Sequence, residues 1–154
     1  MDHLRWMSRA VELAHRSPVS ATAFSVGAVI VDHAGREIAH GFSRDDDPQV
    51  HAEESALLKA DAHVGLQTAT MYSTLEPCSR RRSRPHATCT GLIIAAGISQ
   101  VVIAWREPDL FVTCEGVALL IAAGIEVIEL PEFADRARAA NTHLAFSADS
   151  RAAD

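Results

Sequence analysis

The feature that most constrains the fold is a regular alternation of strand-like and helix-like segments in the second half of the chain. Short runs rich in β-branched residues at 70–75, 100–104 and 125–129 are separated by helix-forming segments that end at Gly97 and Gly124. Glycine suits the left-handed position that follows many helices. Strands that alternate with helices of this length favour right-handed crossovers and parallel neighbours. We therefore predict an α/β fold, a three-layer α/β/α sandwich with a five-stranded mixed sheet.

The first half of the chain supplies the other two strands. Apolar residues at helical spacing predict an amphipathic helix that ends before Pro18, and the runs at 26–31 and 37–42 predict a β-hairpin. An acidic, proline-closed loop then leads into a helix over 51–63. Pro131 is expected to open a last helix near the C-terminus.

Length and composition fit one compact domain. The chain has 154 residues, of which 48% are hydrophobic and 22% charged, and we expect a single domain over residues 1–146 with a flexible C-terminal tail over 147–154. The longest apolar stretches, 91–98 and 117–125, fall short of the roughly 20 residues that a membrane span needs. Charged residues interrupt the N-terminal segment, so a secretory signal is not expected. These observations predict a cytoplasmic protein that does not associate with a membrane.

The charge and the cysteine count narrow the classes of partner. A formal net charge of -6 argues against broad attraction to a polyanion, so an anion site must be local. Three cysteines, an odd number, suit reduced thiols or metal ligands better than a disulfide framework.

Two motifs carry residues that suit metal chemistry. His51-Ala52-Glu53 stands at a predicted helix start, and Glu76-Pro77-Cys78 follows the strand at 70–75 without a break. Ligand sites in such sheets lie beyond the carboxyl ends of the strands. His-x-Glu followed by Pro-Cys-x-x-Cys is typical of zinc-dependent nucleobase deaminases, in which the histidine and both cysteines bind zinc and the glutamate does not.

The second cysteine of that pattern is displaced. Ten residues separate Cys78 from Cys89, whereas Cys-x-x-Cys places both thiolates on one helical turn. The intervening segment must loop out and return. Cys114 and His86 compete with Cys89 as the third ligand. Taken singly, His-x-Glu fits an ordinary polar helix start and the cysteines fit buried thiols, but their combination in this order points to zinc.

The sequence resembles the deaminase domain of the bifunctional riboflavin-biosynthesis deaminase-reductase, a branch of the cytidine-deaminase-like superfamily. The similarity extends over roughly residues 20 to 130. The segments that carry it are 26–31, 51–53, 74–79, Cys89, 92–97, 101–104 and 122–127. The resemblance implies a cytidine-deaminase-like fold, a Zn²⁺ cofactor held by His51, Cys78 and Cys89, and a homo-oligomer, either a dimer or a tetramer.

The sequence also departs from that family. The segment between the zinc cysteines is two residues longer and holds four arginines in positions 80 to 84. Ala23-Phe24 replace an Asn-Pro pair, and the stretch from Phe24 to Ala28 looks more like nucleoside cytidine deaminases. The chain stops about where the family's reductase domain would begin, so no reductase activity is expected.

Eight residues are candidates for contacting a substrate. The arginines in positions 80 to 84 either bind a substrate phosphate through bidentate hydrogen bonds or form a solvated loop. The candidate substrate-binding residues are Phe24, Ala52, Glu76, Arg80, Arg81, Arg82, Arg84 and His86. Aromatic residues make up 5% of the chain, which leaves little for nucleic-acid bases to stack on and argues against a nucleic-acid partner.

The leading hypothesis is zinc-dependent hydrolytic deamination of an aminopyrimidine nucleoside or nucleotide, with release of ammonia. The substrate would be a riboflavin-pathway diaminopyrimidine phosphate or a molecule of the cytidine or deoxycytidylate type. Glu53 would be the catalytic residue, taking a proton from water and passing it to the ring and then to the departing amine. Two alternatives remain. A non-catalytic structural zinc module would use Cys114 or His86 as a fourth ligand, and a nucleic-acid-editing deaminase would bind polyanions with a steep salt dependence.

Overall fold

Five strands form one mixed sheet in the computed structural model, which describes residues 2–60, 65–81, 84–106 and 114–144. Their order is β2-β1-β3-β4-β5. The strands are β1 (Gly27–Val31), β2 (Glu37–Phe42), β3 (Thr70–Ser73), β4 (Gln100–Ile103) and β5 (Glu126–Glu129). β1 pairs antiparallel with both β2 and β3, while the β3–β4 and β4–β5 pairs are parallel. The predicted five-stranded mixed sheet is confirmed.

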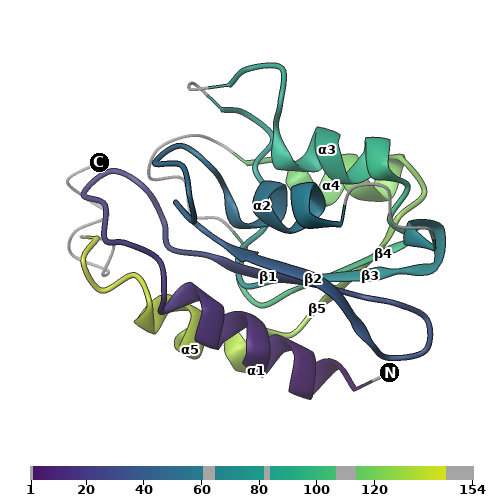
Figure 1. Ribbon diagram of the computed structural model, residues 1–154, viewed down its shortest axis with the longest axis horizontal. Coiled ribbons are helices and arrows are strands. Elements are labelled where there is room, and N and C mark those ends of the chain that lie inside the picture. Colours follow the sequence, from purple (N-terminus) through teal and green to yellow (C-terminus); the bar gives the residue numbers. More distant parts are fainter. Residues whose placement is uncertain (1, 61–64, 82–83, 107–113, 145–154) are drawn as a thin grey trace.

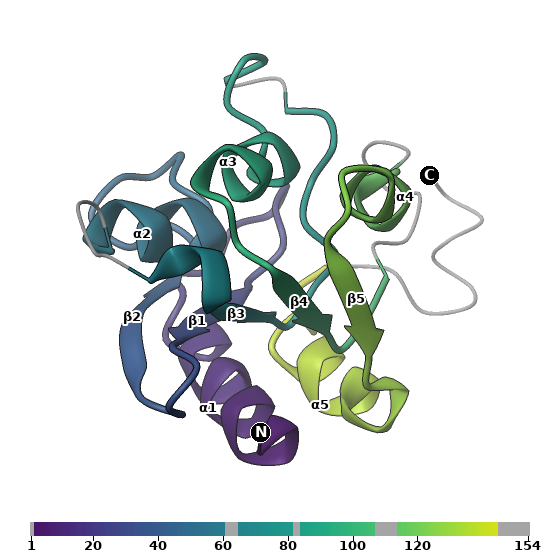
Figure 2. The same ribbon diagram turned by 90° about the vertical axis from the view of Figure 1, so that its right-hand side faces the viewer.

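Helices cover both faces of the sheet. They are α1 (His3–Ala14), α2 (Ala52–Lys59), α3 (Cys89–Ala96), α4 (Gly116–Ala122) and α5 (Ala134–Ala139), with short 3₁₀ turns η1 (Leu66–Thr68) and η2 (Pro131–Phe133). Figure 1 shows α2, α3 and α4 above the sheet and α1 and α5 below it, and Figure 2 shows the same three layers from the side. The predicted α/β/α sandwich is confirmed.

The alternation of side chains along β1 explains why both faces need cover. Ala28 and Ile30 belong to the core cluster that includes Met71, whereas Val29 and Val31 belong to a second cluster. Successive side chains of a strand point to opposite faces, so a strand that is apolar throughout is stable only between two layers. Among the helices of the described ranges, none combines the length and apolarity that a membrane span requires.

Several element bounds differ from the sequence-based expectation. β3 ends at Ser73 rather than at residue 75, because the Ser73 hydroxyl donates to the carbonyl of Leu75 at 2.8 Å and bends the chain. α2 ends at Lys59, and part of the predicted helix, 61–64, lies outside the described residues. The predicted tail over 147–154 also lies outside them.

One end of the strands gathers the loops that carry the candidate residues. Ser73, at the end of β3, pairs with Ala28 near the start of β1 and with Ile103 at the end of β4. Gly27, which begins β1, pairs with Phe42 at the end of β2. The loop before β1 and the loops after β2, β3 and β4 therefore leave the sheet at the same end.

Candidate active site

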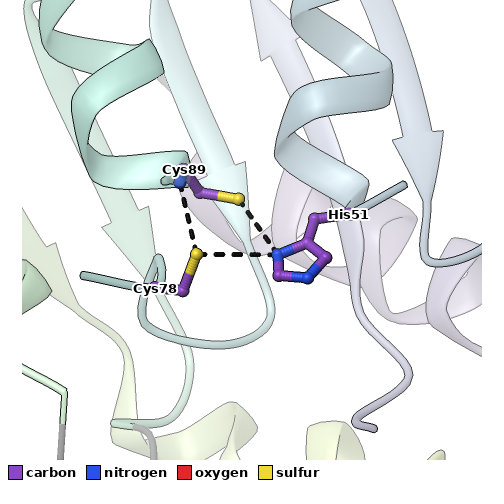
Figure 3. Close-up of side chains that lie close together, drawn as sticks. All are labelled: His51, Cys78 and Cys89. Atoms are coloured by element: carbon purple, nitrogen blue, oxygen red, sulfur yellow. Dashed lines mark hydrogen bonds between the residues drawn. The ribbon is translucent and has the colours of Figure 1, made fainter. Parts of the chain in front are cut away.

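Three side chains from separate segments converge at this end of the sheet. His51 is the residue before α2, Cys78 lies in the loop after β3, and Cys89 is the first residue of α3. His51 Nδ1 lies 3.6 Å from Cys78 Sγ and 3.3 Å from Cys89 Sγ (Figure 3). One ligand atom from each of the three lies within 4.8 Å of the others.

The spacing of these atoms fits a tetrahedral zinc ion. Zinc–sulfur and zinc–nitrogen bonds of about 2.3 and 2.05 Å place a sulfur and a nitrogen ligand roughly 3.6 Å apart. The observed separations of 3.6 and 3.3 Å are close to this value. An imidazole and two thiolates are also donors that zinc prefers. His51, Cys78 and Cys89 are thus positioned to bind a metal ion.

The two competing ligands lie apart from this group. Within the described part of the chain, the candidate metal cluster holds His51, Cys78 and Cys89 and no further side chain. The Cys114 thiol donates instead to the carbonyl of Pro77 at 3.3 Å. His86 is exposed. The geometry therefore favours Cys89 as the third ligand and offers no support for a closed four-ligand site.

The pKa values of the two cysteines shift in opposite directions. The Cys89 thiol donates a hydrogen bond to Cys78, which lowers the pKa of Cys78 to about 4, and His51 adds to this shift. The backbone N–H of Cys89, at the start of α3, also donates to Cys78 Sγ at 3.2 Å. The same hydrogen bond, together with burial, raises the pKa of Cys89. A metal that binds both thiolates must displace the proton of the Cys89 thiol.

Glu53 lies in the first turn of α2, two residues beyond His51, with 3% of its surface exposed. Its Oε2 lies 3.3 Å from the hydroxyl of Ser73 at the end of β3. Burial, and next the charge of Cys78, raise the pKa of Glu53 to about 7. A carboxyl group with a pKa near neutrality can both accept and release a proton, as acid–base catalysis requires.

Three of the predicted substrate-binding residues, Phe24, Ala52 and Glu76, are buried. Phe24 packs edge-on against Trp105, with ring centroids 5.6 Å apart. Ala52 is completely buried next to His51. Glu76 is also buried, and its Oε2 accepts a hydrogen bond from Val117 N at the start of α4 at 2.9 Å. Their contact with a substrate stays a prediction.

Gly116 lets α4 approach the loop after β3 closely. A Cβ atom at this position would lie 2.1 Å from the carbonyl oxygen of Pro77, well inside van der Waals contact. The first turn of α4 therefore packs directly against the residue that precedes Cys78.

The predicted arginines have different surroundings. Arg81 is buried and pairs with Glu54 at 2.8 Å, so it is not part of a solvated loop. Arg84 pairs with Glu54 at 2.6 Å and with Asp47 at 2.8 Å. Arg80 and His86 are exposed, and Arg82 lies outside the described residues. A role for any of them in substrate binding stays a prediction.

Sequence reasoning missed Glu54 as the partner of these arginines. Burial would raise the pKa of Glu54, but hydrogen bonds from Arg81 and from the backbone of His51 hold it below its ordinary value. Glu54 Oε1 accepts from His51 N at 3.2 Å. The spacing of three residues between the start of a helix and a glutamate is a capping signal that could have identified it.

Comparison with known proteins adds a family match. A family model described as the cytidine and deoxycytidylate deaminase zinc-binding region matches residues 1–105 of this chain. The diaminohydroxyphosphoribosylamino-pyrimidine deaminase of Schizosaccharomyces pombe is 44% identical over 137 residues, which make up 87% of this chain and 33% of that protein. The chain spans about a third of the length of the curated relatives that it matches.

Solved structures share the fold. Acinetobacter baumannii RibD, form 1, superposes with a TM-score of 0.75 and 36% identity, covering 90% of this chain and 37% of that chain. The Aspergillus oryzae Rib2 deaminase in complex with DARIPP superposes with a TM-score of 0.70 and 27% identity, covering 82% of this chain and 84% of that one.

Proposed function

We propose that this chain, which belongs to the cytidine and deoxycytidylate deaminase zinc-binding family, is a zinc-dependent pyrimidine deaminase. The observation that carries the proposal is the group of His51, Cys78 and Cys89, with the buried carboxyl of Glu53 two residues from the histidine. A structural zinc site would need a fourth protein ligand, and the described residues around this group supply three.

The proposed substrate is a diaminohydroxyphosphoribosylaminopyrimidine, the compound in the name of the S. pombe relative. Deoxycytidylate and cytidine are the nearest competitors. Arg81 and Arg84 already hold the Glu54 carboxylate, whereas Arg80 and His86 are exposed in the same segment between the cysteines. This contrast supports Arg80 and His86 as the groups that reach the substrate's phosphate.

In the proposed reaction, Glu53 transfers protons and Ser73 orients Glu53. A bound zinc ion supplies Lewis acidity, which can lower the pKa of water to about 7. Glu53 takes the proton of the attacking water and delivers it to the ring nitrogen beside the amino-bearing carbon. The water oxygen bonds to the amino-bearing carbon, and Glu53 then takes the remaining proton of the new hydroxyl group and passes it to the amino group. The C–N bond breaks, ammonia leaves, and the hydroxyl oxygen becomes the carbonyl oxygen. The Ser73 hydroxyl, 3.3 Å from Glu53 Oε2, helps to orient this carboxyl group.

Ammonia release from a panel of substrates tests this proposal. The panel holds the diaminopyrimidine ribosyl phosphate, its dephosphorylated form, deoxycytidylate and cytidine, each assayed with zinc-loaded and zinc-stripped protein. We expect the zinc-loaded protein to give the highest kcat/KM with the phosphorylated diaminopyrimidine. A preference for deoxycytidylate would correct the substrate, and no ammonia from any compound would overturn the enzymatic proposal. Light scattering on the same sample tests the expected homo-oligomer.

A further inference from the structure

We infer that Arg81 is a positioning residue. It fixes the positions of the three metal ligands relative to one another and does not bind the substrate. Ten residues separate Cys78 from Cys89, so the sequence spacing alone does not fix where Cys89 lies relative to Cys78. Cys-x-x-Cys would fix both thiolates on one helical turn. A long loop gives no such constraint, so other contacts must fix where its second cysteine returns.

Part of this constraint comes from the start of α3. The carbonyl of Cys78 accepts a hydrogen bond from Thr90 N at 3.1 Å, and the thiol of Cys78 accepts one from Cys89 N at 3.2 Å. Cys78 thus lies against the first turn of the helix that carries Cys89. These contacts relate the two cysteines to each other, but they do not fix the position of His51, the residue before α2.

The guanidinium of Arg81 supplies that link. Arg81 Nη1 donates to the carbonyl of Ala87, two residues before Cys89, at 2.9 Å. Arg81 Nη2 donates to the carbonyl of Gln49, two residues before His51, and to Glu54 Oε1 at 2.8 Å. Arg81 itself follows Cys78 by three residues. The guanidinium of a residue three positions after Cys78 therefore contacts the chain two residues before His51 and two residues before Cys89.

Glu54 completes the connection to His51. The same oxygen that accepts from Arg81 also accepts from the backbone N–H of His51 at 3.2 Å. The Arg81 side chain is 2% exposed and that of Glu54 is 8% exposed, so the ion pair is shielded from water. Buried charged hydrogen bonds of this kind are stronger and more directional than exposed ones. Arg84 and Asp47 extend the network outward.

Lysine cannot replace arginine at this position without loss. A lysine keeps the positive charge, but its single ammonium lacks the rigid fork that reaches two backbone carbonyls and a carboxylate together. Residues that orient metal ligands typically change metal affinity by about 10- to 100-fold when they are replaced. Arg81→Lys should therefore fold and bind zinc about 10- to 100-fold more weakly than the parent.

The experiment compares Arg81→Lys with Arg9→Lys as a matched control. Arg9 also pairs with a glutamate, Glu37 at 3.2 Å, but it lies on α1 below the sheet. Zinc affinity is measured by competition with a chelator, and Co²⁺ is titrated as a spectroscopic probe of the ligand geometry. Circular dichroism of the zinc-free protein checks that each variant is folded. A merely structural role for Arg81 would lower the unfolding temperature without altering the Co²⁺ spectrum of the folded protein.

We expect Arg81→Lys to lose zinc affinity at least tenfold and to change the Co²⁺ absorption bands, while Arg9→Lys matches the parent. A folded Arg81→Lys with zinc affinity within threefold of the parent and an unchanged spectrum would overturn the inference. If Arg81→Lys does not fold, Glu54→Gln is judged by the same thresholds. The inference rests on the metal site and not on the substrate, so zinc binding without ammonia release would overturn the proposed function and leave this inference standing.

Discussion

The choice between Cys89 and Cys114 as the third metal ligand gives a sharp test, because a serine can replace either cysteine. Cys89 Sγ lies 3.3 Å from His51 Nδ1, whereas the thiol of Cys114 donates to the carbonyl of Pro77 at 3.3 Å. Cys89→Ser removes a thiolate from the metal site. Cys114→Ser replaces a weak thiol donor with a hydroxyl that can donate to the same carbonyl.

The size of the expected loss follows from the energy of zinc binding. Structural sites with four ligands bind zinc with about 10–16 kcal/mol, which gives an average of about 2.5–4 kcal/mol for each ligand. At 1.4 kcal/mol for each factor of ten, the loss of one ligand weakens binding by roughly 100- to 1,000-fold. Cys89→Ser should show this loss, whereas Cys114→Ser should bind zinc as the parent does.

Competition with a colorimetric chelator measures both affinities, and circular dichroism of the zinc-free proteins confirms that both variants are folded. The two serine variants carry the same chemical change at different places, so each serves as the control for the other. Zinc affinity that falls in Cys114→Ser and stays unchanged in Cys89→Ser would refute the assignment of the ligands.

Three further predictions concern the acid–base residue, a helix cap and an exposed ion pair. Glu53→Gln should keep zinc, as metal analysis would show, and lower the rate of ammonia release by about 10²- to 10⁴-fold, because a positioned proton carrier is lost. Thr88→Ala should lower the free energy of unfolding, measured in urea, by about 1 kcal/mol, because the Thr88 hydroxyl caps α3 by accepting from Gly91 N. Burial raises the pKa of Glu37, but its ion-pair partners outweigh burial and hold that pKa below 4.5. Glu37 therefore stabilises the fold above pH 4.5 and loses this effect as the pH falls through its folded-state pKa, so Glu37→Gln should reduce the acid dependence of unfolding by less than about 1 kcal/mol.

Most of this fold is predictable from the sequence, because the bounds and order of its helices and strands follow from short patterns such as glycines after helices. The left-handed glycines Gly97 and Gly124 are observed at the ends of α3 and α4, with φ values of 79° and 87°. The β-hairpin and the parallel order of β3, β4 and β5 also follow from element order and length. The end of β3 was less predictable, because a hydrogen bond from the Ser73 side chain bends the chain there.

The candidate metal ligands His51 and Cys78, and the proposed acid–base residue Glu53, were predictable for a different reason. His51, Glu53 and Cys78 belong to short motifs at the ends of predicted elements, where the topology brings them together. Cys89 required the family resemblance, since its distance from Cys78 has no local geometric meaning.

The surroundings of the arginines were not predictable from the sequence. Arg81 meets Glu54 across 27 positions of the chain. Four arginines in five positions are typical of a solvated or phosphate-binding loop, and only the fold shows that Arg81 and Arg84 have carboxylate partners. The sequence shows where charged residues cluster along the chain, but it does not show which of them form ion pairs in the fold.

X-ray absorption at the zinc edge tests the central claim most directly, because it counts the sulfur atoms around the ion. The geometry of His51, Cys78 and Cys89 predicts one zinc per chain with two sulfur neighbours and two lighter neighbours. A third sulfur, or a purified chain that binds no zinc, would contradict the site from which the proposed deamination is derived.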